Sequence, residues 1–329
     1  MVPSMRRYMR AIAVVAASAL VCLLIPNPST SQELTVIRVG RPDGTSMTTL
    51  PVILGDKLGI WKSVGLDMQQ SALRGDAQVQ QALAAGSVDA AMASGPGIGF
   101  LTKGVPAKVI AQLVNAPAYY GLIVPANSPI KTMADLRDKK VAVSTVGSLT
   151  AWLTTQVATK EGWPADSITI VPLGDSKGEE AGAESGAVDA FVTGSDTGYD
   201  MEVHNKGHVV MTFESLVQHF PTNLLYARTD FIAAHPDVVK RFLTGWFRCI
   251  AYMRAHKAET VKFAADAQGL AEEAEAKSYD KIMPVMSTNG TLDPAGFDRL
   301  AQSLLDVGVT KTKVDLKQYL YPNFLPVKI

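Results

Sequence analysis

Four short clusters of hydroxyl side chains and glycines are the residues of this chain best suited to hold a ligand. They span residues 43–49, 94–97, 144–150 and 193–196, and each follows a segment with the pattern of a β-strand. Small residues let a ligand approach the backbone, and hydroxyls with the free N–H groups of a following helix can hold an anion. Ordinary loop and N-cap chemistry favours the same residue types. Because four clusters recur at equivalent points, we favour a shared ligand cleft.

The histidines, cysteines and glycine motifs indicate no catalytic or metal site. His204 and His208 form the closest histidine pair, but Gly207 between them predicts a loop, whereas a metal pair at this spacing needs a regular helix. The chain has no Gly-x-Ser-x-Gly elbow, no phosphate loop and no complete dinucleotide fingerprint. Cys249 lies on an apolar helix stripe, which is typical of a buried, unreactive thiol. We therefore expect no catalytic residue, no metal and no cofactor.

Composition excludes several other classes of protein. The chain has 329 residues, of which 47% are hydrophobic and 19% charged, so it is long enough for about two folded domains. The chain has 31 basic residues (lysine and arginine) and 31 acidic residues (aspartate and glutamate). This balance argues against a nucleic-acid partner, since nucleic-acid binders normally have an excess of basic residues. Two cysteines rule out a disulfide scaffold.

The first 31 residues have the pattern of a secretory signal peptide. Arg6, Arg7 and Arg10 precede an uncharged run over 11–25, and small residues follow up to Ser31. A membrane anchor is the alternative, but 15 residues are short for a span. Cleavage after Ser31 leaves 28 basic and 31 acidic side chains, a net charge of −3. We expect a periplasmic protein, with the general or the twin-arginine export route left open.

Strand and helix patterns alternate through the rest of the chain, which favours an α/β fold with parallel or mixed sheets. The expected strands are 34–39, 64–70, 88–93, 109–114, 140–144, 168–172 and 188–193, and the expected helices 46–58, 76–85, 150–160 and 179–185. Residues 85–90 and 185–190 share Gly, Val, Asp and Ala at an offset of 100, which indicates two similar halves. The last third has helical spacing from Pro236 onward and again after Asp293.

Four segments between residues 35 and 260 resemble the periplasmic solute-binding proteins of ABC importers in the nitrate, sulfonate and taurine class, which includes thiamine-precursor binders. These segments are 51–67, 81–90, 127–136 and 139–143. The usual glycine before the lysine pair is Asp138 here. The resemblance implies a periplasmic binding protein-like (type II) fold, with two similar α/β lobes, a hinge and a ligand cleft.

The resemblance also implies lobe limits and site residues. Lobe I would comprise 33–121 plus 222–329 and lobe II 122–221, with crossovers near 120–124 and 222–226. The ligand-binding residues expected in the cleft are Thr45, Ser46, Met47, Ser94, Gly95, Tyr119, Thr145, Gly147, Ser148, Leu149, Ser195, Thr222 and Asn223. Tyr119 would form a wall for an organic ligand, and Trp152 would either share that role or belong to the core.

The expected function is capture of a small organic anion, such as a sulfonate or carboxylate, or of a related heterocycle, for delivery to an ABC transporter permease. Few cations lie near the clusters, chiefly Arg41, Arg74 and Lys177, which suits hydrogen bonding from N–H groups or a neutral ring. We expect a monomer. One alternative is an enzyme on the same fold, of the desulfinase or pyrimidine-precursor synthase type, which would need a reactive cysteine in the cleft. Another is a periplasmic sensor domain, which would need a receptor helix or fused domain.

Overall fold

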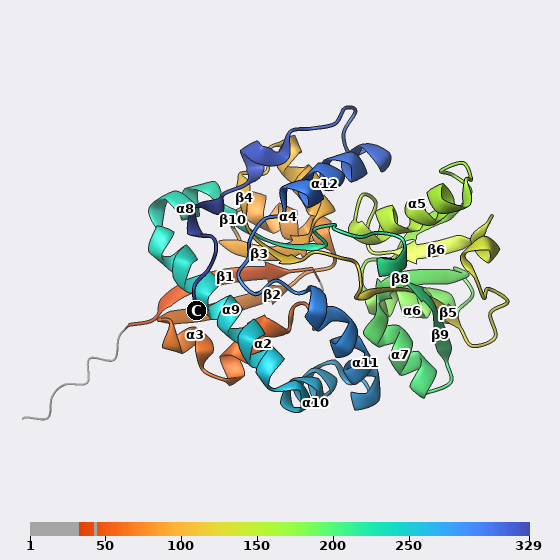
Figure 1. Cartoon of the computed structure of the whole chain (residues 1–329), viewed down its shortest axis with the longest axis horizontal. Coiled ribbons are helices and arrows are strands. Elements are labelled where there is room, and N and C mark those ends of the chain that lie inside the picture. The colour runs from red at the N-terminus through yellow and green to blue at the C-terminus, as the bar shows by residue number, and fades with distance from the viewer. Residues whose placement is uncertain (1–32, 43–44) are drawn as a thin grey trace, which may run out of the picture. The chain divides into compact units, whose positions relative to one another are not determined.

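Two five-stranded sheets organise the computed structural model, which describes residues 33–42 and 45–329 (Figure 1). The predicted signal peptide, 1–31, lies outside the described residues. Leu34–Ile329 form one compact unit. Among the residues that the structure describes, no helix combines the length and hydrophobicity that crossing a membrane requires.

Sheet A has the strand order β2-β1-β3-β10-β4. β1 pairs in parallel with β2 and β3, and β10 pairs antiparallel with β3 and β4. The strand bounds are β1 Thr35–Arg41, β2 Leu66–Ala72, β3 Ala90–Ser94, β4 Ala107–Val114 and β10 Asn223–Arg228. β3 is buried along its whole length, as expected of an inner strand covered on both faces.

Sheet B repeats this arrangement, in the order β7-β6-β8-β5-β9. β6 pairs in parallel with β7 and β8, and β5 pairs antiparallel with β8 and β9. The bounds are β5 Tyr120–Pro125, β6 Lys140–Val143, β7 Thr169–Pro172, β8 Ala190–Gly194 and β9 Gly207–Thr212. Position by position, the strand order and directions match those of sheet A.

The internal similarity at an offset of 100 is confirmed in detail. Helices α4 (Asp76–Ala84) and α6 (Ser176–Glu184) begin and end at equivalent residues, as do β3 and β8. Gly86 and Gly186 follow these helices with φ angles of 70° and 74°, a left-handed conformation that glycine adopts without strain. The Asp89 carboxylate accepts from the Arg38 backbone N–H at 2.9 Å. The Asp189 carboxylate accepts from the Lys140 N–H at 2.8 Å in the same way.

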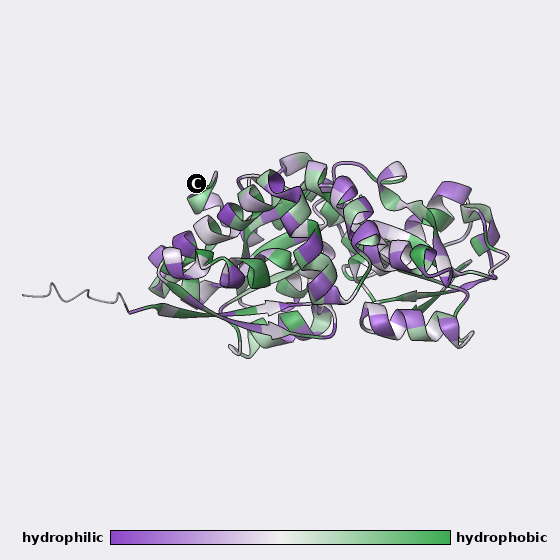
Figure 2. Cartoon of the chain, turned by 90° about the horizontal axis from the view of Figure 1, so that it is seen from below, coloured by the Kyte–Doolittle hydropathy of each residue, from purple (hydrophilic) through white to green (hydrophobic). Residues whose placement is uncertain are grey.

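Helices cover both sheets, and in Figure 2 they carry alternating hydrophilic and hydrophobic residues along their length. The remaining α-helices are α2 Leu50–Lys57, α3 Ile60–Ser63, α5 Leu149–Glu161, α7 Ser195–Val203, α8 Thr229–Ala234, α9 Pro236–Ala255, α10 Lys257–Gln268, α11 Glu272–Ile282 and α12 Pro294–Asp306. The short 3-10 helices are η1 Pro96–Lys103, η2 Met133–Leu136, η3 Phe213–Ser215, η4 Met283–Val285, η5 Leu316–Tyr319 and η6 Pro322–Phe324.

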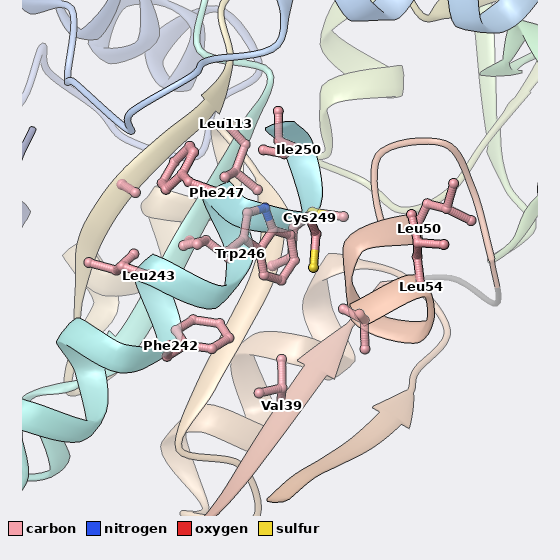
Figure 3. Packing of buried hydrophobic residues seen from close by; sticks show 14 of the residues in the cluster. Val39, Leu50, Leu54, Leu113, Phe242, Leu243, Trp246, Phe247, Cys249 and Ile250 are labelled. Atoms are coloured by element: carbon pink, nitrogen blue, oxygen red, sulfur yellow. The ribbon is translucent and has the colours of Figure 1, made fainter. Parts of the chain in front are cut away.

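The long helix α9 places its apolar face in the core of sheet A. Trp246, Phe242 and Cys249 are fully buried there, in a cluster with Leu50 and Leu54 of α2 (Figure 3). The helical pattern predicted from Pro236 onward is thus confirmed, and it anchors sheet A rather than lining a ligand site.

The segments predicted as crossovers, 120–124 and 222–226, are instead inner strands β5 and β10 of the two sheets. Their apolar side chains are buried within the sheets, which explains why strand pairing is favoured over an exposed connection. The chain passes between the sheets through 115–119 and returns through 213–222. The lobe limits inferred from the resemblance stay a prediction.

Helix α11 packs on α7, a helix of sheet B, although it follows the helices of sheet A in the chain. The Ala271 backbone N–H donates to the Asp200 carboxylate at 2.7 Å, and Lys281 pairs with Glu214 at 2.7 Å. The C-terminal region therefore contacts both sheets.

Candidate ligand-binding site

A cavity of about 420 Å³ lies where strands of both sheets end. Carboxyl ends of parallel strands are the usual ligand position in α/β sheets, and this volume is typical of small-molecule sites. From sheet A and its helices it is lined by Pro42, Thr45, Ser46, Thr48, Gly75, Asp76, Met92, Ser94 and Asn223. From the crossing segment, sheet B and its helices it is lined by Tyr119, Tyr120, Ser144, Leu149, Thr150, Gly174, Asp175, Ser176, Lys177, Glu179, Glu180, Thr193, Gly194, Asp196 and Thr197. Ala267, Gln268 and Leu270 complete the lining from the end of α10.

The sheet A wall is organised by hydroxyl groups that bond to one another and to a buried acid. The Ser46 hydroxyl lies 3.0 Å from the hydroxyls of both Thr48 and Thr49. Asp76, the first residue of α4, accepts from the Ser94 backbone N–H at 2.9 Å and also from the Ser94 hydroxyl. Burial raises the pKa of Asp76, while these bonds from Ser94 oppose the rise.

The sheet B wall contains a second buried acid, Glu179, in the first turns of α6. Its side chain is buried, and neither carboxyl oxygen has a hydrogen-bond partner of normal geometry in the described structure. Burial raises the pKa of Glu179 to about 8, and the Thr193 hydroxyl only partly opposes this rise. An unliganded carboxyl in this position is therefore mostly protonated at neutral pH.

A third acid, Asp196 on α7, joins the cavity to the C-terminal region. The Tyr119 hydroxyl donates to its carboxylate at 2.5 Å, and burial raises the pKa of Asp196. Glu275 on α11 lies nearby and accepts from the Gln268 amide. Burial, with the charge of Asp196, raises the pKa of Glu275 to about 9. Two neighbouring buried acids thus lie at this end of the cavity, Asp196 in its lining and Glu275 outside the lining.

Direct contacts between the two halves close the cavity. Arg74, between β2 and α4, pairs with Asp175 before α6 at 3.2 Å. The Trp152 indole N–H of α5 donates to Asp306 of α12 at 3.3 Å. Trp152 also stacks on Phe220 with ring centroids 4.2 Å apart. Trp152 is buried in a hydrophobic cluster and lies outside the lining, so it belongs to the core.

Six of the thirteen predicted site residues line the cavity: Thr45, Ser46, Ser94, Tyr119, Leu149 and Asn223. The other seven lie outside the lining: Met47, Gly95, Thr145, Gly147, Ser148, Ser195 and Thr222.

Local packing explains why several predicted residues lie behind the lining. Met47 is fully buried in the core of sheet A. The Ser148 hydroxyl caps α5 by accepting from the Ala151 N–H at 3.3 Å. The Gly95 N–H donates to the Thr222 carbonyl at 2.8 Å, which holds these two residues together where β3 ends and β10 begins.

Acidic residues are the part of the lining that the sequence pattern did not reveal. Asp76, Asp175, Glu179, Glu180 and Asp196 line the cavity, and Lys177 is the one basic side chain among the described lining residues. Asp196 lies within the predicted cluster 193–196, so its position was detectable. Glu179 and Glu180 resemble an ordinary exposed helix face in sequence, and only the packing of α6 on sheet B shows that Glu179 points inward.

The described residues offer no arrangement of three or more His, Cys, Asp or Glu side chains that could hold a metal ion. The cavity lining offers hydrogen-bonding and charged groups, with an apolar contribution from Met92, Tyr119, Tyr120, Leu149 and Leu270. Tyr119 and Tyr120 pack edge to face with centroids 5.5 Å apart.

Solved structures share this two-sheet architecture. The alkanesulfonate-binding protein SsuA from Xanthomonas axonopodis pv. citri bound to MOPS is 16% identical, with a TM-score of 0.77 over 88% of this chain and 99% of that one. The periplasmic nitrate-binding protein NrtA from Synechocystis PCC 6803 is 17% identical, with a TM-score of 0.70 over 87% and 85%. A cysteine-to-serine mutant of DSZB in complex with biphenyl-2-sulfinic acid is 15% identical, with a TM-score of 0.61 over 88% and 97%. The fold is therefore that of the two-lobed periplasmic binding proteins.

Sequence comparison narrows this class to a family. The family described as NMT1/THI5 like matches residues 46–260, and the chain belongs to it. A protein of Brucella abortus (strain 2308), named as a candidate binding protein, is 25% identical over 326 residues, which cover 95% of this chain and 98% of the relative. The resemblance found in the sequence to the nitrate and sulfonate class is confirmed.

Proposed function

We propose that this protein is an extracytoplasmic solute-binding protein that captures a small molecule between its two lobes and delivers it to the permease of an ABC importer. The observation that carries the proposal is the cavity at the strand ends of both sheets, with walls contributed by both. A ligand held by both walls stabilises the closed arrangement, so binding shifts the population toward closure. The crossing segments 115–119 and 213–222 are the proposed hinge.

The export and assembly proposals complete this function. Residues 1–31 act as the signal peptide, the mature protein works in the periplasm, and it acts as a monomer. Of the two ligand classes expected from the sequence, an organic anion and a heterocycle, the lining favours the second. Its described residues include five acids and one lysine, so an anion would find few cations there to pair with.

A binding role is favoured over catalysis by the position of Cys249. It is the one cysteine among the described residues, and it is buried in the core on α9 rather than in the cavity lining (Figure 3). Burial raises the pKa of its thiol, which suppresses the reactive thiolate. The described residues therefore contain no equivalent of the reactive cysteine that the enzymes considered above would need in the cleft.

The test is identification of the natural ligand by mass spectrometry of protein purified from the periplasm. We expect one small molecule to be released intact on denaturation, and its return to the stripped protein to reduce the radius of gyration in small-angle X-ray scattering. Conversion of that molecule to a product during incubation, or binding without any change of radius, would contradict the proposal. The Cys249→Ser variant is the control, and it should bind as the wild type does.

A further inference from the structure

The cavity contains buried hydrogen-bond acceptors that the protein itself does not satisfy. Both carboxyl oxygens of Glu179 and the side-chain carbonyl oxygen of Asn223 lack a partner of normal hydrogen-bond geometry in the described structure. Glu179 is 1% exposed and Asn223 is 3% exposed, and both residues line the cavity. Buried acceptors left unpaired destabilise a fold, so their presence in a ligand cavity indicates that a ligand supplies the missing donors.

These acceptors face the cavity from both halves of the protein. Glu179 belongs to α6 over sheet B, and Asn223 is the first residue of β10 in sheet A. The Asn223 amide nitrogen is already directed at the Met92 sulfur, at 3.6 Å, so its carbonyl oxygen remains as the acceptor. A ligand that donates to both residues would bridge the two sheets.

Several hydroxyl groups of the lining already bond within the protein. Ser94 donates to Asp76, Tyr119 donates to Asp196, and Ser46 bonds to the hydroxyls of Thr48 and Thr49. A sulfonate or carboxylate would bring more acceptors and a negative charge into a site that already contains unpaired acceptors. Such a ligand could accept from Glu179 only through the proton of its neutral form, and it would leave the Asn223 carbonyl oxygen unpaired.

The surrounding charges point in the same direction. Of the five carboxyl groups in the lining, the Asp175 carboxylate has a cation within 4 Å, the mostly exposed Arg74. Glu180 is half-buried beside Lys177, whose ammonium is exposed. A positive charge on the ligand would therefore meet more carboxyl groups than cations in this lining, which Tyr119 and Tyr120 share.

We infer that the ligand carries a basic nitrogen group, an ammonium or an amidine-like N–H donor on a compact apolar or aromatic body, which pairs with Glu179 and Asn223. This inference rests on the proposed function, because it specifies the ligand class of the same cavity. Glu179 becomes the charge partner by losing its proton in the complex, because a nearby positive charge favours the carboxylate. Asn223 orients a second N–H, and the apolar residues of the lining hold the ligand body.

Matched probes that differ only in the charged group test the inference. Benzylamine and benzamidine are compared with benzoate and benzenesulfonate, by thermal unfolding and titration calorimetry of the processed wild-type protein. We expect the two bases to raise the melting temperature at millimolar concentration, since binding to the folded state stabilises it by mass action, and the two anions to leave it unchanged.

The Glu179→Gln variant tests the named residue. Losing one partner of a buried charge pair should weaken binding of the bases by about 30-fold or more. Glu184→Gln changes an exposed acid on the same helix and should bind them as the wild type does. Unliganded unfolding curves of both variants show whether each is folded.

The outcomes separate this inference from the proposed function. Stabilisation by the anions but not by the bases, or a natural ligand without a basic nitrogen, would overturn the inference and leave the binding function intact. Equal binding of the bases to Glu179→Gln and wild type would also overturn it. If no probe binds and no molecule is released from the periplasmic protein, both are rejected.

Discussion

The carboxyl group of Glu179 is buried in the protein, where water does not solvate it. In the unfolded chain a glutamate ionises near pH 4.5, whereas burial raises the pKa of Glu179 in the folded protein to about 8. Between these values the folded state binds more protons than the unfolded state, so this residue lowers stability as the pH rises. Below pH 4.5 and above pH 8 its contribution no longer changes with pH.

The Glu179→Gln variant should therefore unfold at nearly the same denaturant concentration as the wild type at pH 4.5. At pH 8 it should be more stable by about 2–5 kcal/mol, because the amide has no proton to lose. Urea unfolding at several pH values measures the difference. A stability difference that stays constant across this pH range would contradict the buried-acid interpretation, and Glu184→Gln provides the exposed control.

Several polar residues of the site could be found from the sequence, whereas the buried glutamate could not. Ser46, Ser94 and Asn223 follow or begin strands, where loop composition is informative. Glu179 is followed by a second glutamate in a polar helix, and the sequence alone does not say which of the two faces the sheet. Burial of one acid is decided by tertiary packing, which no local pattern encodes.

Among the elements, α4 and α6 show how the repeat is built. Each is followed two residues later by a left-handed glycine, Gly86 or Gly186, that lets the chain turn into the next strand. A side chain at Gly186 would meet nothing within 4 Å, so any cost of substitution there comes from the backbone alone. At Gly86 an added Cβ would approach the end of the Arg228 side chain at 2.6 Å.

Gly186→Ala should therefore destabilise the protein by about 1–2 kcal/mol, since only the left-handed backbone conformation opposes the methyl group. Gly186→Asn should lose less, because asparagine tolerates this conformation better than alanine. Chemical denaturation measures both. If Gly186→Ala unfolded at the wild-type denaturant concentration, the positive φ angle at this turn would be wrong.

Most elements follow from the sequence because their patterns are local. The strands before and after each repeated glycine and the apolar stripe of α9 are of this kind. β5 and β10 were predicted as crossovers, because the resemblance placed the lobe connections there. Their role as inner antiparallel strands depends on partners that are distant in the chain, such as β8 and β3.

At the scale of the whole molecule, contacts between α5 and α12 hold the two halves together on one side of the cavity. The indole N–H of Trp152 donates to Asp306, and this bond can form only when the halves are close. In the proposed opening of the lobes this bond would break, so we expect it to contribute to the balance between the open and closed states.

Trp152→Phe should shift that balance toward the open state, because it keeps an aromatic ring on Phe220 but removes the N–H donor. Loss of one hydrogen bond should weaken ligand binding by about fivefold and increase the radius of gyration of the unliganded protein in solution scattering. Asp306→Asn retains an acceptor and should have a smaller effect. Unchanged scattering and affinity in Trp152→Phe would show that this bond does not govern closure.

The repeat at an offset of 100 also has an evolutionary consequence, because its two copies differ at the cavity. Asp76 corresponds to Ser176, and Glu179 corresponds to Val79, which is buried in the hydrophobic core of its own half. If the halves arose by duplication, their buried acids, Asp76 on α4 and Glu179 on α6, now occupy positions that differ by about one helical turn. The two walls of the cavity consequently present different residues at equivalent positions, so the repeat in the fold does not extend to the groups that face the ligand.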